Sequence, residues 1–188
     1  MEREALALDI RRIVTDSDLD GVVTAAILRR WWPEAEVVFG HPGELRAGLL
    51  DEHIDRHTAV CDLPRHPDCG LSIDHHQSNA PSEGDDHGVV IIWRESPSAA
   101  RIAYDMLAGE VDLSDLEDLL VWVDKLDGGG INREEFLSDH PVIWLGRVID
   151  IEAGIANHIL EALQHGVSVD KILSDTVVEP ALEKRRAK

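Results

Sequence analysis

The sequence predicts an α/β fold, with a mostly parallel five-stranded sheet, helices on both faces and a helical C-terminal extension. Three observations predict it. Short apolar runs typical of strands alternate with longer amphipathic runs typical of helices over residues 1–130. The last strand-type run, GVVIIW at 88–93, is apolar throughout, as in strands buried on both faces of a parallel sheet. Over residues 131–188 only helical patterns continue.

The strand signals follow one another in order. The expected strands are at 10–15, 35–39, 58–62, 71–74 and 88–93. The helices expected between and after them are at 20–32, 43–53, 97–107 and 114–127. The first of these helices stops before Pro33, which cannot continue a helix. Strands separated by helices form βαβ units, and such strands run parallel.

Cap residues mark the ends of the later helices. Ser96 is the expected N-cap of the helix at 97–107, with Pro97 in its first position. The glycines at 128–130 end the following helix. The extension then carries helical patterns at 141–151, 153–166 and 169–175, and ends in a basic tail at 183–188.

The composition excludes some classes of function. The net charge is −19, which repels long nucleic acids through the mean field of the protein. A local pocket can still bind a small anion. No apolar run is long enough to span a membrane, and the first residues lack the layout of a signal peptide. We therefore expect a soluble, cytoplasmic protein with no membrane partner.

Acidic residues stand where several strands end. Asp16, Asp62 and Asp74 each directly follow or close a strand signal. In a parallel sheet the carboxyl ends of the strands meet at one edge, and ligands bind there. The sequence therefore predicts a site built from acids that lie far apart in the chain.

Two short motifs give this site its chemistry. The first places Asp16, Asp18 and Asp20 two residues apart in one turn, where three carboxylates cannot all stay ionised without a cation. The second is Asp74 followed by two histidines. Carboxylate oxygens and imidazole nitrogens together suit one or two divalent transition metals.

The first motif has two other interpretations. An EF-hand loop also begins with this spacing, but its twelfth position needs a glutamate and here holds Ile27. The segment DLDGVVT also resembles haloacid-dehalogenase-like phosphatases, in which the first aspartate follows a strand and is phosphorylated. Here the residues at 15–17 precede Asp18, and this alternative leaves the histidine pair unused.

The motifs together resemble the DHH phosphoesterase superfamily. The resemblance covers roughly residues 10–130 and rests on four segments in order: Asp16-x-Asp18-x-Asp20-Gly21, Asp62 in AVCDLP, Asp74-His75-His76, and an aspartate in WVDKLDGG. Relatives include RecJ-type exonucleases, nanoRNase/pAp phosphatases, family II pyrophosphatases and exopolyphosphatases. The resemblance implies a DHH-type catalytic domain at 1–130, with 131–188 as the helical extension.

The resemblance implies two divalent metal ions, usually Mn²⁺, with Mg²⁺ or Co²⁺ as alternatives. By matched position, Asp18 and Asp20 would each hold a metal. Asp62 would bridge the two ions, and His75 would complete the second. Asp16 stands where some relatives carry histidine and would contribute to the first.

The remaining motif positions have other implied roles. His76 would face the substrate phosphate, and Asp74 would orient the histidine pair. The fourth motif offers Asp124 and Asp127, which lie three residues apart on one helix and can share a face. We favour Asp127 as the metal ligand because it directly precedes the glycine turn.

The chain departs from the family pattern in its C-terminal part. Many relatives carry a second domain with a GGGH motif that grips the substrate, whereas the glycines at 128–130 precede Ile131. Substrate recognition is therefore expected from the helical extension, a homodimer partner or the core alone. Arg94 and Arg101 are weak candidates for contacting phosphate, because surface solvation or an ion pair explains each of them better.

These features favour a metal-dependent phosphoesterase in which two metals activate a water. The expected substrates are small: a short oligonucleotide, a nucleotide phosphate or a polyphosphate. The alternatives are the aspartyl-nucleophile phosphatase described above and a binding module that keeps the fold without turnover.

Overall fold

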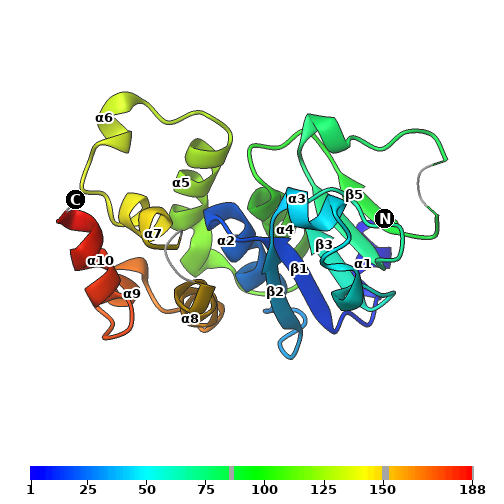
Figure 1. Ribbon diagram of the computed structural model, residues 1–188, viewed down its shortest axis with the longest axis horizontal. Coiled ribbons are helices and arrows are strands. Elements are labelled where there is room, and N and C mark those ends of the chain that lie inside the picture. The colour runs from blue at the N-terminus through cyan, green and yellow to red at the C-terminus, as the bar shows by residue number, and fades with distance from the viewer. Residues whose placement is uncertain (85–86, 150–152, 188) are drawn as a thin grey trace.

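The computed structural model describes residues 1–84, 87–149 and 153–187. Its centre is a five-stranded sheet in the order β2-β1-β3-β4-β5, and every neighbouring pair is parallel. The strands are β1 (Arg12–Asp16), β2 (Glu36–Gly40), β3 (Thr58–Cys61), β4 (Leu71–Asp74) and β5 (Val90–Trp93). The predicted α/β class and parallel five-stranded sheet are confirmed, and the sheet is parallel throughout the described residues (Figure 1).

Helices surround the sheet. Before and between the strands are α1 (Glu2–Leu6), α2 (Leu19–Leu28) and α3 (Pro42–Arg46). After the last strand come α4 (Ala99–Leu107) and α5 (Glu117–Asp127). The C-terminal helices are α6 (Arg133–Phe136), α7 (Pro141–Ile149), α8 (Ala153–Gln164), α9 (Val169–Leu173) and α10 (Glu179–Arg186). None of the helices in the described ranges is long and apolar enough to cross a membrane.

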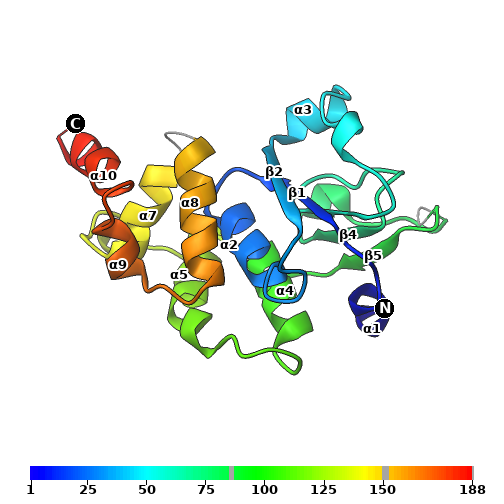
Figure 2. The ribbon, with the colours of Figure 1, turned by 90° about the horizontal axis from the view of Figure 1, so that it is seen from below.

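The two faces of the sheet are covered unequally. On one face Ile13, Ala59 and Ile73 join the main core with α2 and α4, and α5, α7 and α8 extend that core outward. On the other face Val14 and Val60 pack in a smaller cluster under α3 and the short 3₁₀ turn at Asp51–His53. The C-terminal helices therefore continue the core on the α2 side, as Figure 2 shows.

Several boundaries differ from those the sequence predicts. The segment 43–53 divides into α3 and a 3₁₀ turn, because Gly48 adopts a left-handed conformation with φ of 73°. The N-cap of α4 is Ser98, whose hydroxyl accepts the N–H of Arg101, so the helix starts two residues later than Ser96 implied. The basic tail is helical as far as Arg186, as the end of α10, and residue 188 lies outside the described residues. Residues 150–151 of the expected helix at 141–151 lie outside the described residues.

Gly21 is required by the close approach of α2 to β1. A Cβ placed on Gly21 would collide with the backbone carbonyl of Asp16. We expect Gly21→Ala to lower the free energy of unfolding by about 2 kcal/mol, because the backbone must shift to admit the methyl group. Urea unfolding would measure the change. Gly43→Ala is the control, since a Cβ there meets no atom within 4 Å, and equal losses in both variants would contradict the explanation.

Candidate metal centre

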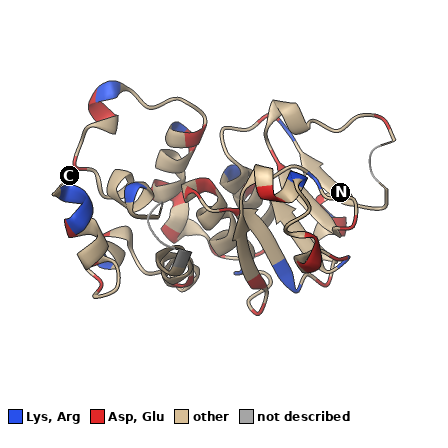
Figure 3. Cartoon of the chain, in the orientation of Figure 1, with Lys and Arg blue, Asp and Glu red and all other residues tan. Residues whose placement is uncertain are grey.

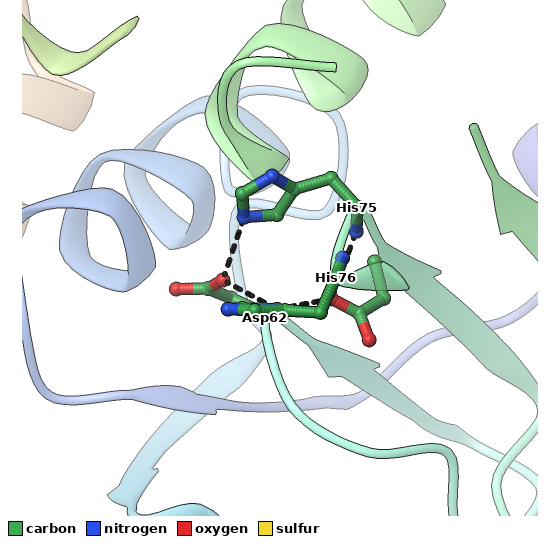
Figure 4. A group of neighbouring side chains, drawn as sticks. Asp62, His75 and His76 are labelled. Atoms are coloured by element: carbon green, nitrogen blue, oxygen red, sulfur yellow. Dashed lines mark hydrogen bonds and ion pairs between the residues drawn. The ribbon is translucent and has the colours of Figure 1, made fainter. Parts of the chain in front are cut away.

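Acidic and imidazole side chains converge at the carboxyl edge of the sheet. Asp16 ends β1, Asp62 directly follows β3, and Asp74 ends β4. These three strands are neighbours, so their ends lie side by side. His75 comes next in the chain, and its ring turns toward Asp62 (Figure 4).

His75 points an unpaired nitrogen into this cluster. Its Nδ1 lies 3.0 Å from the carbonyl oxygen of Ser96. A carbonyl only accepts, so Nδ1 carries a proton, and the ring in its neutral form would keep a lone pair on Nε2. Nε2 is buried and makes no hydrogen bond to any described residue. A buried lone pair of this kind is the group that a metal ion satisfies.

Three carboxylates surround that nitrogen. Nε2 of His75 lies 3.1 Å from Oδ2 of Asp127, and 3.6 Å from both Oδ2 of Asp20 and Oδ1 of Asp62. Burial alone would lower the pKa of His75, but Asp127, Asp62 and Asp20 together raise it to about 11. In metal-free protein the acids thus favour the protonated, positively charged ring, and a bound divalent cation would take the place of that proton. Potential ligand atoms of Asp20, His75 and Asp127 all lie within 4.8 Å of one another, as do those of Asp62, Asp74 and both histidines.

The Asp20 carboxylate is held by the start of α4. Oδ2 accepts the N–H of Ala99 and Oδ1 accepts that of Ala100, each at 2.8 Å. Burial, followed by the charge of Asp127, raises the pKa of Asp20 to about 7 despite these hydrogen bonds. The two N–H groups fix the carboxylate in place. Oδ1 also accepts the hydroxyl of Thr24 at 3.4 Å, so Oδ2 is the oxygen that keeps a further lone pair for a cation.

Asp62 occupies an unusual backbone conformation. Its φ is 56°, in the left-handed region that few residues other than glycine adopt. Its side chain is 3% exposed, and burial with the nearby Asp20 charge raises the pKa of its carboxyl well above the usual range. Strain and a buried charge at one residue are typical of a functional position.

His76 and Asp74 form a second pair at the rim. Nδ1 of His76 donates to Oδ1 of Asp74 at 2.7 Å, and this bond raises the pKa of His76. Oδ1 of Asp74 also accepts the N–H of His75, and Oδ2 accepts Nδ2 of Asn79 at 2.6 Å. Asp74 therefore orients its neighbours, while the half-exposed ring of His76 faces solvent. Asn79 was not singled out in the sequence, although it is a polar residue in the turn right after the histidines.

Asp16 and Asp18 stand at the edge of the cluster. Oδ1 of Asp16 accepts the N–H of Ser17 at 2.7 Å and lies 3.2 Å from Nδ1 of His41. Oδ1 of Asp18 accepts the N–H of Gly21 and so caps α2. The charge of Asp18 raises the pKa of both Asp20 and Asp62, so it too faces the cluster.

The structure separates the two fourth-motif acids. Asp127 lies against His75, whereas Asp124 accepts two bonds from the guanidinium of Arg101 and one from the hydroxyl of Ser98. Arg101 is therefore engaged in positioning α5 on α4. Arg94 is also paired, with Glu2 and Asp105. Neither arginine is brought into the cluster.

Of the comparisons with known proteins, the one with solved structures found a similar protein. No protein-family model matches the chain, and no curated protein matches it. Among solved structures, the chain is similar to PggH, a pGpG-specific phosphodiesterase from Vibrio cholerae, with a TM-score of 0.72 and 25% identity. The chain has the fold of a phosphodiesterase. The match covers 92% of this chain and 58% of PggH, so the chain spans little more than half of that protein.

The positions of Asp124 and Asp127 predict that the same substitution affects metal binding at one residue and stability at the other. We expect Asp127→Asn to weaken Mn²⁺ binding by about tenfold or more, because a carboxylate beside Nε2 of His75 is lost. Asp124→Asn should keep Mn²⁺ affinity but lower the free energy of unfolding by about 2 kcal/mol, because Arg101 loses its partner. Calorimetric titration and urea unfolding measure the two effects. Loss of Mn²⁺ binding in Asp124→Asn alone would reverse the assignment.

The raised carboxyl pKa values predict a pH dependence of stability in metal-free protein. A carboxyl with a raised folded pKa contributes stability below its unfolded pKa and loses it as the pH rises through the folded value. For Asp20 this window runs from 3.8 to about 7, which corresponds to on the order of 4 kcal/mol. We expect the melting temperature in EDTA to fall across this window.

The control for this dependence is Asp20→Asn, whose amide does not titrate. Its melting temperature should fall less steeply over the same window, whatever its starting stability. Added Mn²⁺ should flatten the curve of the unsubstituted protein, because a bound cation favours the ionised carboxylates. A metal-free protein that gains stability throughout the window would show that these acids are not confined together.

Proposed function

We propose that this protein is a metal-dependent phosphoesterase of the DHH type that hydrolyses a small phosphorylated substrate. The observation that carries the proposal is the buried lone pair on Nε2 of His75, with three carboxylates around it. The similarity to a pGpG-specific phosphodiesterase supports the phosphoester chemistry.

Of the residues at the sheet edge, some would bind the metal ions and others would contact the substrate. The metal-holding residues in this proposal are Asp18, Asp20, Asp62, His75 and Asp127, with Asp16 as a further candidate. These oxygen and nitrogen donors fit two divalent ions, and we propose Mn²⁺, with Mg²⁺ or Co²⁺ as alternatives. Such ions, when bound, lower the pKa of a water ligand and stabilise charge on phosphoryl oxygens.

Asp74 and His76 would act on the substrate side. Asp74 holds the ring of His76 through the 2.7 Å bond to Nδ1. His76 is half-exposed at the mouth of the cluster, where it would contact a phosphoryl oxygen. Asp74 would therefore be a positioning residue, and His76 the residue that touches the substrate.

The substrate would be a short oligonucleotide, a nucleotide phosphate or a polyphosphate. The net charge of −19 opposes association with long polyanions, and that repulsion grows with the number of phosphates near the surface. A short substrate experiences the negative electrostatic field of the protein only at the site, where the positive charge of the metal ions would offset that repulsion. Long nucleic acids are therefore poor candidates.

The aspartyl-nucleophile alternative fits the local geometry less well. It requires Asp18 to follow a strand directly, but β1 ends at Asp16 and Asp18 caps α2 through Gly21. It also gives no role to His75. A binding module that has lost turnover would be expected to lack one or more ligands, whereas here every motif carries a residue that can bind metal.

The decisive assay is release of phosphate or nucleotide in the presence and absence of Mn²⁺. The substrates compared would be a short oligoribonucleotide, pAp and pyrophosphate. We expect Mn²⁺-dependent turnover that Asp62→Asn reduces by about a hundredfold or more. Asparagine tolerates the left-handed backbone of this position, so the variant removes charge without added strain.

His75→Ala separates the alternatives. The proposal expects it to remove Mn²⁺ binding and turnover together, with no phosphorylated protein at any time. Retention of both would exclude the DHH-type mechanism, and a phosphoenzyme abolished by Asp18→Asn would establish the aspartyl nucleophile. Bound Mn²⁺ without turnover of any phosphoester would leave the binding module as the function.

A further inference from the structure

A cavity of about 570 Å³ opens directly beside the acidic cluster. Asp18, Asp20 and Asp127 form one end of its lining. The rest comes from Leu19 of α2, from α5, and from the C-terminal α6–α7 segment and α10. Its volume lies within the usual range for sites that bind small molecules.

The walls next to the acids are apolar. Val123 and Leu126 of α5 face the cavity together with Ile143 of α7. Phe136, at the end of α6, also lines it, and its side chain is half-exposed. A ligand that contained only phosphate would leave this apolar surface without a partner. The walls instead suit an organic ring system.

Two arginines complete the lining. Arg147 of α7 and Arg185 of α10 both border the cavity, and basic residues gather on α10 in Figure 3. The guanidinium of Arg147 donates to the carbonyl of Phe136 at 2.6 Å and lies 4.6 Å from the centre of the Trp144 ring. This fixes its position without neutralising its charge.

Neither arginine has an acidic partner in the part of the chain that the structure describes. This stands out in a chain with 37 acidic and 18 basic residues, where carboxylates are abundant. By contrast Arg11, Arg30 and Arg101 all pair with carboxylates. Two arginines at one cavity, neither with an acidic partner among the described residues, are suited to bind an external anion, above all a phosphate.

We propose that this cavity binds the nucleoside part of the substrate, and that Arg147 and Arg185 hold a second phosphate attached to it. This rests on the proposed function, because the scissile phosphate would lie at the acidic end. The ligand is then a nucleoside between two phosphates, as in a 5′-phosphorylated dinucleotide. The C-terminal helices thus supply the substrate subsite, and pyrophosphate and polyphosphate are disfavoured.

The test measures binding in metal-free protein, so it does not depend on turnover. Calorimetric titration in EDTA would compare a 5′-phosphorylated diribonucleotide with the same dinucleotide lacking that phosphate. We expect Arg185→Ala to weaken binding of the phosphorylated ligand by about tenfold or more. Lys184→Ala is the matched control, because it removes the same charge from the same helix without lining the cavity.

The two ligands turn the comparison into a thermodynamic cycle. Removing the terminal phosphate should weaken binding to the unsubstituted protein and change little in Arg185→Ala. Equal losses in Arg185→Ala and Lys184→Ala would show a general charge effect and overturn the subsite. Equal affinity of the unsubstituted protein for both ligands would also overturn the subsite, and so would a lack of binding of either ligand.

The nucleoside contact has its own pair of variants. Phe136→Ala should weaken dinucleotide binding about fivefold or more, since a base loses an aromatic neighbour. Leu137→Ala should not, because this neighbouring exposed residue does not line the cavity. Identical binding by both variants would remove the nucleoside from the proposal.

The outcomes of this test and of the turnover assay are separable. Mn²⁺-dependent hydrolysis with no effect of Arg185→Ala on binding would keep the proposed function and reject the subsite. Phosphate-dependent binding at Arg185 without turnover would keep the subsite and reject the enzymatic function.

Discussion

The carboxylate of Asp20 joins the start of α2 to the start of α4. It starts from the first turn of α2 and accepts the N–H groups of Ala99 and Ala100 at the start of α4. These two helices pack extensively on each other and together cover one face of the sheet. The same carboxylate lies within reach of Nε2 of His75. Because the backbone of α4 holds it, the geometry of the candidate metal centre follows from the packing of the core.

This arrangement costs stability in the absence of a cation. Asp20 and Asp62 are buried, and the desolvation that raises their pKa values opposes folding when both are ionised. The strained φ of Asp62 adds to the cost. Such local costs are typical of functional sites, where the rest of the fold compensates for them. The large core beneath α2 and α4 provides that compensation.

Much of the fold could be predicted from the sequence because the apolar runs are strong local signals. The runs around Val14, Val60 and Ile73 indicate strands, and parallel strands must bring Asp16, Asp62 and Asp74 to one edge. Helix boundaries were less predictable. Both Ser96 and Ser98 are suitable caps, and only the hydrogen bond to the N–H of Arg101 distinguishes them.

The parts of the site that could not be predicted depend on tertiary contacts. The sequence favours Asp127 over Asp124 only by its place before the glycine turn, and the pairing of Asp124 with Arg101 across two helices is what separates them. The cavity could not be predicted from the sequence either, because tertiary contacts bring its lining together. Its lining runs from Asp18 to Arg185, so no local pattern marks it.

The parallel order of the strands also has a kinetic consequence. Three of the four parallel pairs, all except β3 with β4, close a long segment before their contacts form, which slows folding. The acids at the strand ends become neighbours during that step, so their mutual repulsion acts on the barrier as well as on the final state. A divalent ion present during refolding would screen this repulsion as the edge assembles. The metal centre would then accelerate the formation of the fold that creates it.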